Sequence, residues 1–486
     1  MQTRTITEAI SDLICGKHNE ISESVLDRAV VAFVDTIGVA LAGASEPAVE
    51  IAARFAGTQF AAGGAAATSV VETSQRLSAC GAAFVNAIAA HALDYDDVSS
   101  TVEGHPSALL VPVLLACSEG GSATGRDVLE AYLIGLQVSS SIGAGFDMRA
   151  AYAHGWHTTS VLGLLGAAAA VARLRGLEPP QVRTAIGIAG SVAAGSRASF
   201  GTMVKPLHVG VAAVQAIMAA ELARSGYSAN PDIVGAPLGF LALHVGDVID
   251  QSAIEHALAR PVGAVVADVD MKRYPCCYHS HRMIDAALTL RSRLVVANGS
   301  HVDVLDVDVV EQVRITTAPG GTAALLFHRP VSATEAKFSA EYTVSAALLD
   351  GAISSATFEE SAIAREAVRA LMSRTEVGEQ DVPPIGSRAW EDSYAVVQVV
   401  MRDGSRVAER VDLPKGGHLN PLSASQLEEK FLLCSEQHPS RKMDGARGFG
   451  LLSAMRNDSD AGSLLRRILA PAEPNPKPRP RKFEVQ

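Results

Sequence analysis

Two histidines and four carboxylates stand close together in one short segment, at His91, Asp94, Asp96, Asp97, Glu103 and His105. The apolar run 82–90 before this segment and the run 108–116 after it both predict buried helices. Carboxylates and imidazoles held between two buried helices shift each other's pKa values, as proton transfer near neutral pH requires. A helix end with a few solvated acids would give the same pattern, so both interpretations stay open at this stage.

Three ionisable residues elsewhere stand just before an apolar run that predicts a helix: His157, Lys205 and Lys272. The amide groups and the dipole at the start of a helix attract anions, and a nearby lysine adds a full positive charge. Together with the segment 91–105, these residues predict a site for a small molecule that carries several carboxylates.

These segments resemble the MmgE/PrpD family, which includes 2-methylcitrate dehydratase, cis-aconitate decarboxylase and iminodisuccinate epimerase. The motifs that carry the resemblance are 91–107, 155–160, 205–210, 272–287, Arg329-Pro330, 335–339 and Asn420-Pro421. The similarity extends from about Ile6 to about Leu469. The resemblance implies a mainly α fold, in which a large all-helical domain joins a smaller α+β lid domain. It also implies an active site where the two domains meet, and a homodimer.

The resemblance assigns a role to each matching residue. Asp94 and His105 match the acid and the histidine of the first motif, and His157, Lys205 and Lys272 match the second, third and fourth motifs. Both lysines would bind substrate carboxylates, because each ammonium offers three hydrogen-bond donors. One of the two histidines would take or give a proton on carbon, with Asp94 fixing its tautomer. Each residue could instead be structural, as a helix cap, a core histidine or a surface lysine.

Further candidates for substrate binding or for support of the site are Tyr274, His281, His208 and His279. The chain departs from the family pattern at Val98, where many members carry a threonine. It also departs near Phe327, where members carry a tyrosine in the lid. Because both positions carry a hydroxyl in those members, the departures leave open which carboxylic acid is the substrate.

Composition narrows the class of protein. A chain of 486 residues with 48% hydrophobic and 19% charged residues predicts a large buried interior divided between two domains. The net charge is 41 − 52 = −11, which argues against a nucleic-acid partner because no broad basic face is expected. We find no secretory signal and no run of about 18 uninterrupted apolar residues, so we expect a cytoplasmic protein without a membrane span.

The six cysteines indicate reduced thiols and a site without a cofactor. They show no C-x-x-C spacing, and Cys276 and Cys277 are adjacent, which makes it difficult for both to ligate one iron–sulfur cluster. No zinc-protease, phosphate-loop or nucleophile-elbow motif is present in the sequence. We therefore expect chemistry that needs neither a metal ion nor an organic cofactor.

The pattern of apolar residues changes along the chain. The predicted organisation is a helical domain over 1–267, an α+β lid domain over 268–417, a return to the helical domain over 418–470, and a disordered proline-rich tail over 471–486. In the first part, Ser24 and Thr124 are predicted to cap helices over 25–42 and 126–135.

Strand-forming residues are confined to the lid domain. The expected strands are 302–309, 313–317, 394–401 and 407–413, with a hairpin turn at Asp403-Gly404. Helices are expected over 335–349 and 359–373 within the lid domain, and over 423–433 and 461–469 after it.

The leading hypothesis is an enzyme that takes or adds a proton next to a carboxylate of a small di- or tricarboxylate. Dehydration, decarboxylation and epimerisation all remain open, because epimerisation needs two bases on opposite faces of one carbon and a sequence shows no such geometry. A non-catalytic dimer that binds carboxylates is the alternative of another class. Convergence of Asp94, His105, His157, Lys205 and Lys272 in one pocket would favour the enzyme.

Overall fold

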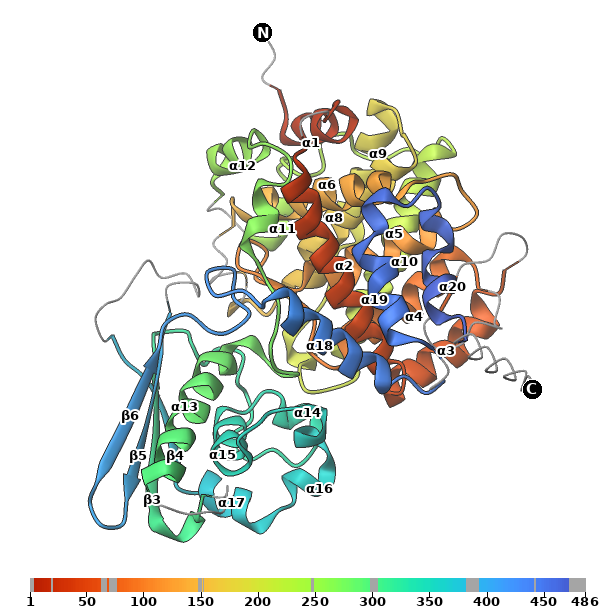
Figure 1. Cartoon of the computed structure of the whole chain (residues 1–486). Helices are drawn as coiled ribbons and strands as arrows, with labels where there is room; N and C mark the ends of the chain where they lie inside the picture. The colour runs from red at the N-terminus through yellow and green to blue at the C-terminus, as the bar shows by residue number, and fades with distance from the viewer. Residues whose placement is uncertain are drawn as a thin grey trace, which may run out of the picture.

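The computed structural model describes residues 4–18, 21–62, 68–69, 77–146, 151, 153–245, 249–297, 305–381, 393–440 and 443–471. Figure 1 shows a large body built of helices and a smaller body in which helices pack beside a sheet. The fold is therefore mainly α with a smaller α+β domain, as the sequence predicts. The expected tail lies outside the described residues, apart from Pro471 at its start.

The helical domain is built around three helices that are apolar on almost every face: α4 (Ala79–Ala92), α5 (Pro106–Ser118) and α8 (Thr158–Leu174). The other described α-helices of this domain before the lid are α1 (Ile6–Cys15), α2 (Glu23–Gly43), α3 (Pro47–Gln59), α6 (Gly125–Gly143), α9 (Pro179–Val192), α10 (Val204–Arg224), α11 (Phe240–His244) and α12 (Gln251–Leu258). A helix that is hydrophobic all round must be surrounded by other elements. Accordingly α4, α5 and α8 are almost entirely buried, and their N- or C-terminal residues are fixed in position by that core.

Helix caps explain where two of the predicted helices begin. The Thr124 hydroxyl accepts from the backbone N–H of Asp127, and the Asp127 carboxylate accepts in return from the N–H of Thr124, which confirms the predicted cap. The cap predicted at Ser24 is wrong. The hydroxyl of Ser22 accepts from Val25 N–H instead, so α2 begins at Glu23 and Ser24 already lies inside the helix.

The lid domain contains a four-stranded sheet covered by helices. The elements are α13 (His281–Ala297), β3 (Val310–Thr317), α14 (Ala333–Ala336), α15 (Ala340–Asp350), α16 (Glu360–Ile363), α17 (Glu366–Met372), β4 (Thr375–Glu379), β5 (Ala395–Met401) and β6 (Arg406–Val411). The strand order is β4-β3-β5-β6; β3 is parallel to β4 and antiparallel to β5, and β5 is antiparallel to β6. The predicted β5–β6 hairpin is confirmed, with Gly404 at φ 85° in its turn.

Three predicted lid elements differ from the structure. Residues 307–309 form a 3-10 turn because the Asp306 side chain accepts from Asp308 N–H, so the strand begins at Val310, and 302–304 lie outside the described residues. The helix expected over 335–349 is divided, because Ser339 caps a new helix by accepting from Tyr342 N–H. The helix expected over 359–373 is likewise divided before Glu366. Strand β4 was not predicted.

The chain enters the lid domain just after Asp270 and leaves it near Gly416, and these two segments lie side by side. Strand β1 (Val98–Ser99) of the helical domain pairs antiparallel with β2 (Val269–Asp270), and Met271 N–H donates to Gly416 O at 2.9 Å. Beyond the lid, α18 (Ala424–Glu436), α19 (Gly445–Ser453) and α20 (Leu464–Leu469) follow. Figure 1 shows the blue α18 and α19 beside the red α2, against which both pack.

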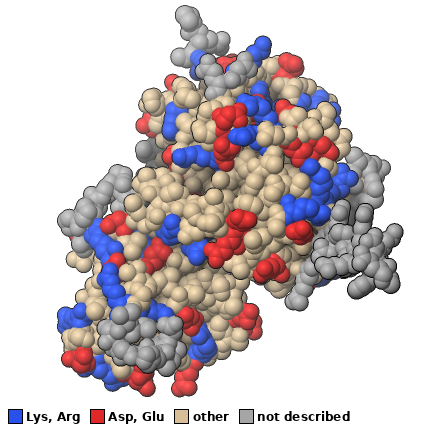
Figure 2. Space-filling model, in the orientation of Figure 1, with Lys and Arg blue, Asp and Glu red and all other residues tan. Residues whose placement is uncertain are grey.

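Among the described residues, one helix, α10, is long and apolar enough to cross a membrane by length and composition alone. It packs against α4, α8 and α9, and 56% of its most apolar window is buried inside the structure. Core packing therefore accounts for its composition. On the face shown in Figure 2, the described lysines and arginines alternate with acids and form no continuous basic patch there. The predicted absence of a nucleic-acid partner and the predicted homodimer remain predictions.

A substitution at Gly125 can test the contact between the C-terminal segment and the start of α6. Its N–H donates to Asp458 O at 2.8 Å, and a Cβ at this position would lie 1.6 Å from Met455 O. We expect Gly125→Ala to lower the free energy of unfolding by about 1–3 kcal/mol or more, because backbone has to move. Urea denaturation measures the effect, with Gly450→Ala in α19 as control.

A Cβ at Gly450 meets no atom within 4 Å, so this control should be neutral or stabilising by about 0.5–1 kcal/mol. Equal stabilities of the two variants would contradict the packing of the C-terminal segment described above.

Candidate functional site

A cavity of about 580 Å³ lies between the helical domain and the lid domain. Four of the five predicted catalytic residues line it: Asp94, His105, His157 and Lys205. Lid residues form the opposite wall, including Tyr278, His279, Arg282, the segment 317–321 and Tyr394. These four residues lie on the helical wall, whereas the sequence patterns missed Arg197 and Phe200 on that wall and Arg282 on the lid wall.

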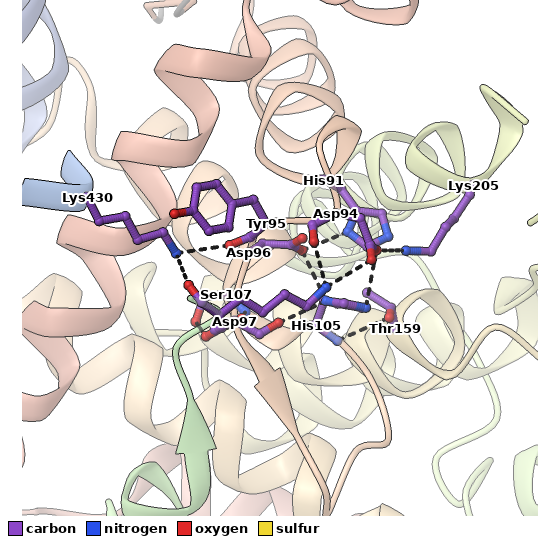
Figure 3. A network of polar contacts seen from close by, with 11 residues as sticks. His91, Asp94, Tyr95, Asp96, Asp97, His105, Ser107, Thr159, Lys205 and Lys430 are labelled. Atoms are coloured by element: carbon purple, nitrogen blue, oxygen red, sulfur yellow. Dashed lines mark hydrogen bonds and ion pairs between the residues drawn. The ribbon is translucent and has the colours of Figure 1, made fainter. Parts of the chain in front are cut away.

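Asp94 is the centre of the polar network at the cavity floor. It follows the end of α4 in the left-handed region, at φ 52°, a conformation that aspartate tolerates better than most residues. Its carboxylate accepts from the ammonium groups of Lys205 and Lys272, the latter at 3.0 Å. Figure 3 shows Lys205, Asp94 and His105 turned toward one another. Burial would raise the pKa of Asp94, but the two lysines outweigh it and hold that pKa well below its ordinary value.

Lys272 lies beneath the cavity rather than on its wall. Its side chain is 0% exposed, and its ammonium donates to the backbone oxygen of Asp94 at 2.8 Å as well as to the carboxylate. Burial would lower the pKa of Lys272, but Asp94 and Asp96 outweigh it and raise that pKa, so the group is charged. The expectation that Lys272 contacts a substrate carboxylate does not match this geometry: the side chain points into the core and fixes Asp94.

Two other predicted binding residues also lie away from the cavity wall. The Tyr274 hydroxyl donates to the Asp285 carboxylate at 2.6 Å, and neither Tyr274 nor His281 lines the cavity. Both side chains are buried, and their rings pack edge to face with centroids 5.1 Å apart. They support the first turn of α13, and the cavity-facing residues of this segment are instead Cys277, Tyr278 and His279.

His105 presents a proton acceptor toward the cavity. It lies at the start of α5, where its Nδ1 contacts Asp97 O at 2.9 Å. Because a carbonyl oxygen can only accept, Nδ1 carries the hydrogen and Nε2 has the lone pair. Nε2 lies 3.9 Å from Asp94 Oδ1. Burial lowers the pKa of His105 well below its ordinary value, so the neutral ring is a base, and the carbonyl of Asp97 sets its tautomer.

A second buried layer supports His105. His91 Nδ1 lies 2.7 Å from the Asp96 carboxylate, which is also 3.4 Å from His105 Nδ1. Burial raises the pKa of the Asp96 carboxyl, but the two imidazoles lower it more, so Asp96 is ionised. The His91 ring lies between His105 and His157, with ring centroids 4.7 and 5.7 Å away. The sequence singled out this segment, but it gave His91 and Asp96 no role.

His157 begins α8, as its motif predicts, and its side chain is buried at the cavity wall. Its Nδ1 lies 3.1 Å from Nδ1 of His208 on α10. Burial lowers the pKa of His157 well below its ordinary value, and the nearby His91 and Lys205 add to this effect. His157 is therefore a neutral imidazole whose hydrogen position depends on His208.

One of the two departures from the family pattern, Val98, lies on the cavity wall. Val98 lines the cavity, whereas the hydroxyl of the neighbouring Ser99 contacts Thr101 at 2.9 Å and does not line it. Phe327 does not line the cavity either. The hydroxyls on the wall belong to Thr159, Tyr278, Thr317, Ser393 and Tyr394.

Within the described part of the chain, one group of side chains has the spacing of a metal site: His91, Asp94, Asp96 and His105, whose ligand atoms lie within 4.8 Å of one another. Its donors are already engaged, because Asp94 accepts from two ammonium groups and Asp96 accepts from His91. Two positive charges in contact with this carboxylate oppose the binding of a divalent cation. The donor set therefore fits a metal poorly. The six cysteines are free thiols.

Comparison with known proteins agrees with these motifs. Residues 8–251 match the MmgE/PrpD N-terminal domain and residues 274–446 match the MmgE/PrpD C-terminal domain. Cis-aconitate decarboxylase of Homo sapiens is 31% identical over 439 residues, which cover 89% of this chain and 88% of that protein. The Mus musculus protein of the same name is 28% identical over 440 residues, covering 89% and 87%. That of Aspergillus terreus is 27% identical over 420 residues, covering 82% of each chain.

Asp97 should make the stability of the protein depend on pH. Its buried carboxyl accepts from Ser107 N–H at 3.2 Å, and burial raises its pKa to about 8 from 3.8. Between these values the folded protein holds a proton that the unfolded chain has released. Raising the pH through this window should therefore cost up to ~1.4 kcal/mol of stability per pH unit. Asp97→Asn, which mimics the protonated carboxyl, should flatten the decline between pH 5 and 8.

Urea denaturation at a series of pH values measures this effect, with the exposed Asp308→Asn as control. Parallel stability curves for the wild type and Asp97→Asn would show that Asp97 is ionised in the fold.

Proposed function

The chain belongs to the MmgE/PrpD family, and from this we propose that it is a lyase that removes CO2 or water from a small di- or tricarboxylate without a cofactor. The relatives named cis-aconitate decarboxylase favour decarboxylation of an aconitate-like acid. The observation that carries the proposal is the convergence of Asp94, His105, His157 and Lys205 on one cavity wall. A protein that only bound carboxylates would not need neutral imidazoles beside its cations.

Loss of CO2 leaves an electron pair on carbon, and a neighbouring carboxylate can spread this charge. Lys205 is placed to stabilise it, because its ammonium lies beside the rings of Phe200 and Phe338, at 5.3 and 5.2 Å from their centroids, and its side chain is only 5% exposed. A fixed positive charge in such a dry environment acts strongly on charge that develops in the transition state. His157 then gives a proton to carbon.

Charge balance indicates where the remaining carboxylates bind. At the cavity floor, the ammonium groups of Lys205 and Lys272 are matched by the carboxylates of Asp94 and Asp96. A substrate with two or three carboxylates therefore needs cations from elsewhere on the wall. Arg197 and Arg282 supply them. Arg197 also spans the junction, because its Nη2 donates to Ala323 O of the lid at 2.9 Å.

The arrangement of the imidazoles favours a lyase over an epimerase. An epimerase needs bases on opposite faces of one carbon, whereas both His105 and His157 pack against the same His91 ring in the helical domain. Across the cavity the lid contributes His279, whose Nδ1 contacts Gly321 O at 3.0 Å. Imidazoles on one wall suit proton transfer at one face of a planar intermediate.

Substrate turnover tests the reaction. Purified protein incubated in heavy water with cis-aconitate, 2-methylcitrate or iminodisuccinate should release CO2 from the first, and NMR should show one deuterium on carbon in the product. Lys205→Met should lower kcat/KM by about ten- to a hundred-fold, the loss of one charge-assisted contact. EDTA should leave the rate unchanged. Turnover of none of the acids, or an EDTA loss that metal reverses, would sink the proposal.

Arg282 tests the binding of the remaining carboxylates. It is 8% exposed, and its Nε donates to Asp412 O at 2.8 Å. Arg282→Met should raise KM for a tricarboxylate by about ten-fold or more while Arg282→Lys restores part of the affinity. Arg293→Met is the matched control, since it removes an arginine of the same helix that is 58% exposed and paired with Glu409. A wild-type KM in Arg282→Met would exclude the role.

A further inference from the structure

The ring of His157 is held in one orientation. Its backbone N–H donates to Gly195 O at 3.0 Å, and the Ser160 hydroxyl of the same turn donates to Ala194 O at 2.7 Å. His91 stacks on the ring with an interplanar angle of 22°, and Phe200 packs against it edge to face at 5.1 Å. A ring clamped in this way cannot exchange its two nitrogens, so each nitrogen keeps its own surroundings.

The two nitrogens of His157 have very different surroundings. Nδ1 lies 3.1 Å from Nδ1 of His208, so one nitrogen carries the hydrogen and the other accepts it. Nε2 is buried and has no hydrogen-bond partner among the residues that the structure describes, in a side chain that lines the cavity. The state of the His157–His208 contact therefore decides whether Nε2 donates or accepts toward a bound substrate.

We propose that His208 is a positioning residue that loads the proton of His157 and replaces it during the reaction. This inference rests on the proposed lyase function, in which a carbanion takes up a proton. In the loaded state His208 is an imidazolium whose Nδ1–H donates to Nδ1 of a neutral His157, and His157 carries its hydrogen on Nε2.

The proton step balances within this pair. The N–H bond at His157 Nε2 breaks as a C–H bond forms on the carbanion, and the hydrogen of His208 Nδ1 passes to His157 Nδ1. His157 stays neutral throughout, His208 changes from imidazolium to imidazole, and the negative charge of the carbanion is discharged. When product leaves, water in the cavity returns a proton to Nε2 and the Nδ1 hydrogen moves back to His208.

When the pair holds one extra proton, its surroundings favour the positive charge on His208 over His157. The ionisable groups that face His208 among the described residues are His91 from α4, His157 at the start of α8, and Lys205 on its own helix. Burial lowers the pKa of both rings, with His91 and Lys205 adding to it, but the fully buried His157 is affected more strongly than the partly exposed His208. Because the cation is favoured at low pH, kcat should rise as the pH falls through the pKa of His208.

Two substitutions separate proton supply from packing. The amide of His208→Gln can still donate a hydrogen bond to His157 Nδ1 but cannot release a proton, whereas His208→Ala removes both functions. We expect each to lower kcat on the active substrate by about ten- to a hundred-fold, with little change in KM and without the rise of kcat at low pH. Added imidazole should restore part of the rate of His208→Ala. His256→Gln on α12, an exposed histidine, is the control.

A wild-type kcat and pH profile in His208→Gln would overturn the inference. A second measurement needs no turnover and so distinguishes failure of this inference from failure of the lyase proposal. In protein labelled with 15N-histidine, NMR reports which nitrogen of His157 carries the hydrogen. His208→Ala should change the population of the two His157 tautomers, and His256→Gln should not. An unchanged His157 tautomer in His208→Ala would exclude the coupling, whichever acid the protein acts on.

Discussion

One carboxylate, that of Asp94, holds the site together. It accepts hydrogen bonds from Lys205 at the start of α10 and from Lys272 at the entry to the lid, so a single turn after α4 joins three parts of the chain. Buried charges are costly unless they are paired, and removal of one partner from such a group costs about 3–5 kcal/mol. The same contacts that keep Asp94 ionised therefore oblige the helical domain and the root of the lid to keep their relative position.

A second ion pair extends this constraint to the C-terminal helices. Lys430 of α18 is paired with Asp35 of α2 at 2.6 Å, and its ammonium also donates to the backbone oxygens of Tyr95 and Lys272 at 3.0 and 2.8 Å. It lies 3.9 Å from the centroid of the Tyr95 ring as well. Packing of α18 on α2 thus fixes the backbone on both sides of the Asp94–Lys272 pair. This explains why the chain returns to the helical domain after building the lid.

Sequence patterns predicted the parts of this arrangement that depend on neighbours in the chain. The cap at Thr124, the β5–β6 hairpin and the polar segment between α4 and α5 are of this kind. Lys272 was misjudged because a lysine before a helix resembles an exposed anion-binding residue. Its burial depends on Asp94, 178 residues earlier. His91 received no role for a similar reason, since its neighbours His105 and His157 reach it only when α5 packs against α4 and α8 packs against α5.

The paired charges at the cavity floor give the two domains different properties at the site. The floor of the cavity is close to neutral, because two ammonium groups oppose the carboxylates of Asp94 and Asp96, and its members are buried and engaged with one another. Such a layer cannot change to suit one acid or another without unpairing a buried charge. The lid wall is built differently: Arg282 Nε donates to the backbone oxygen of Asp412 at 2.8 Å, and Gly320 N–H donates to the Glu379 carboxylate at 2.9 Å. If the chain is the lyase proposed above, proton transfer belongs to the helical domain, and recognition of a particular carboxylic acid belongs to the lid and the residues that face it.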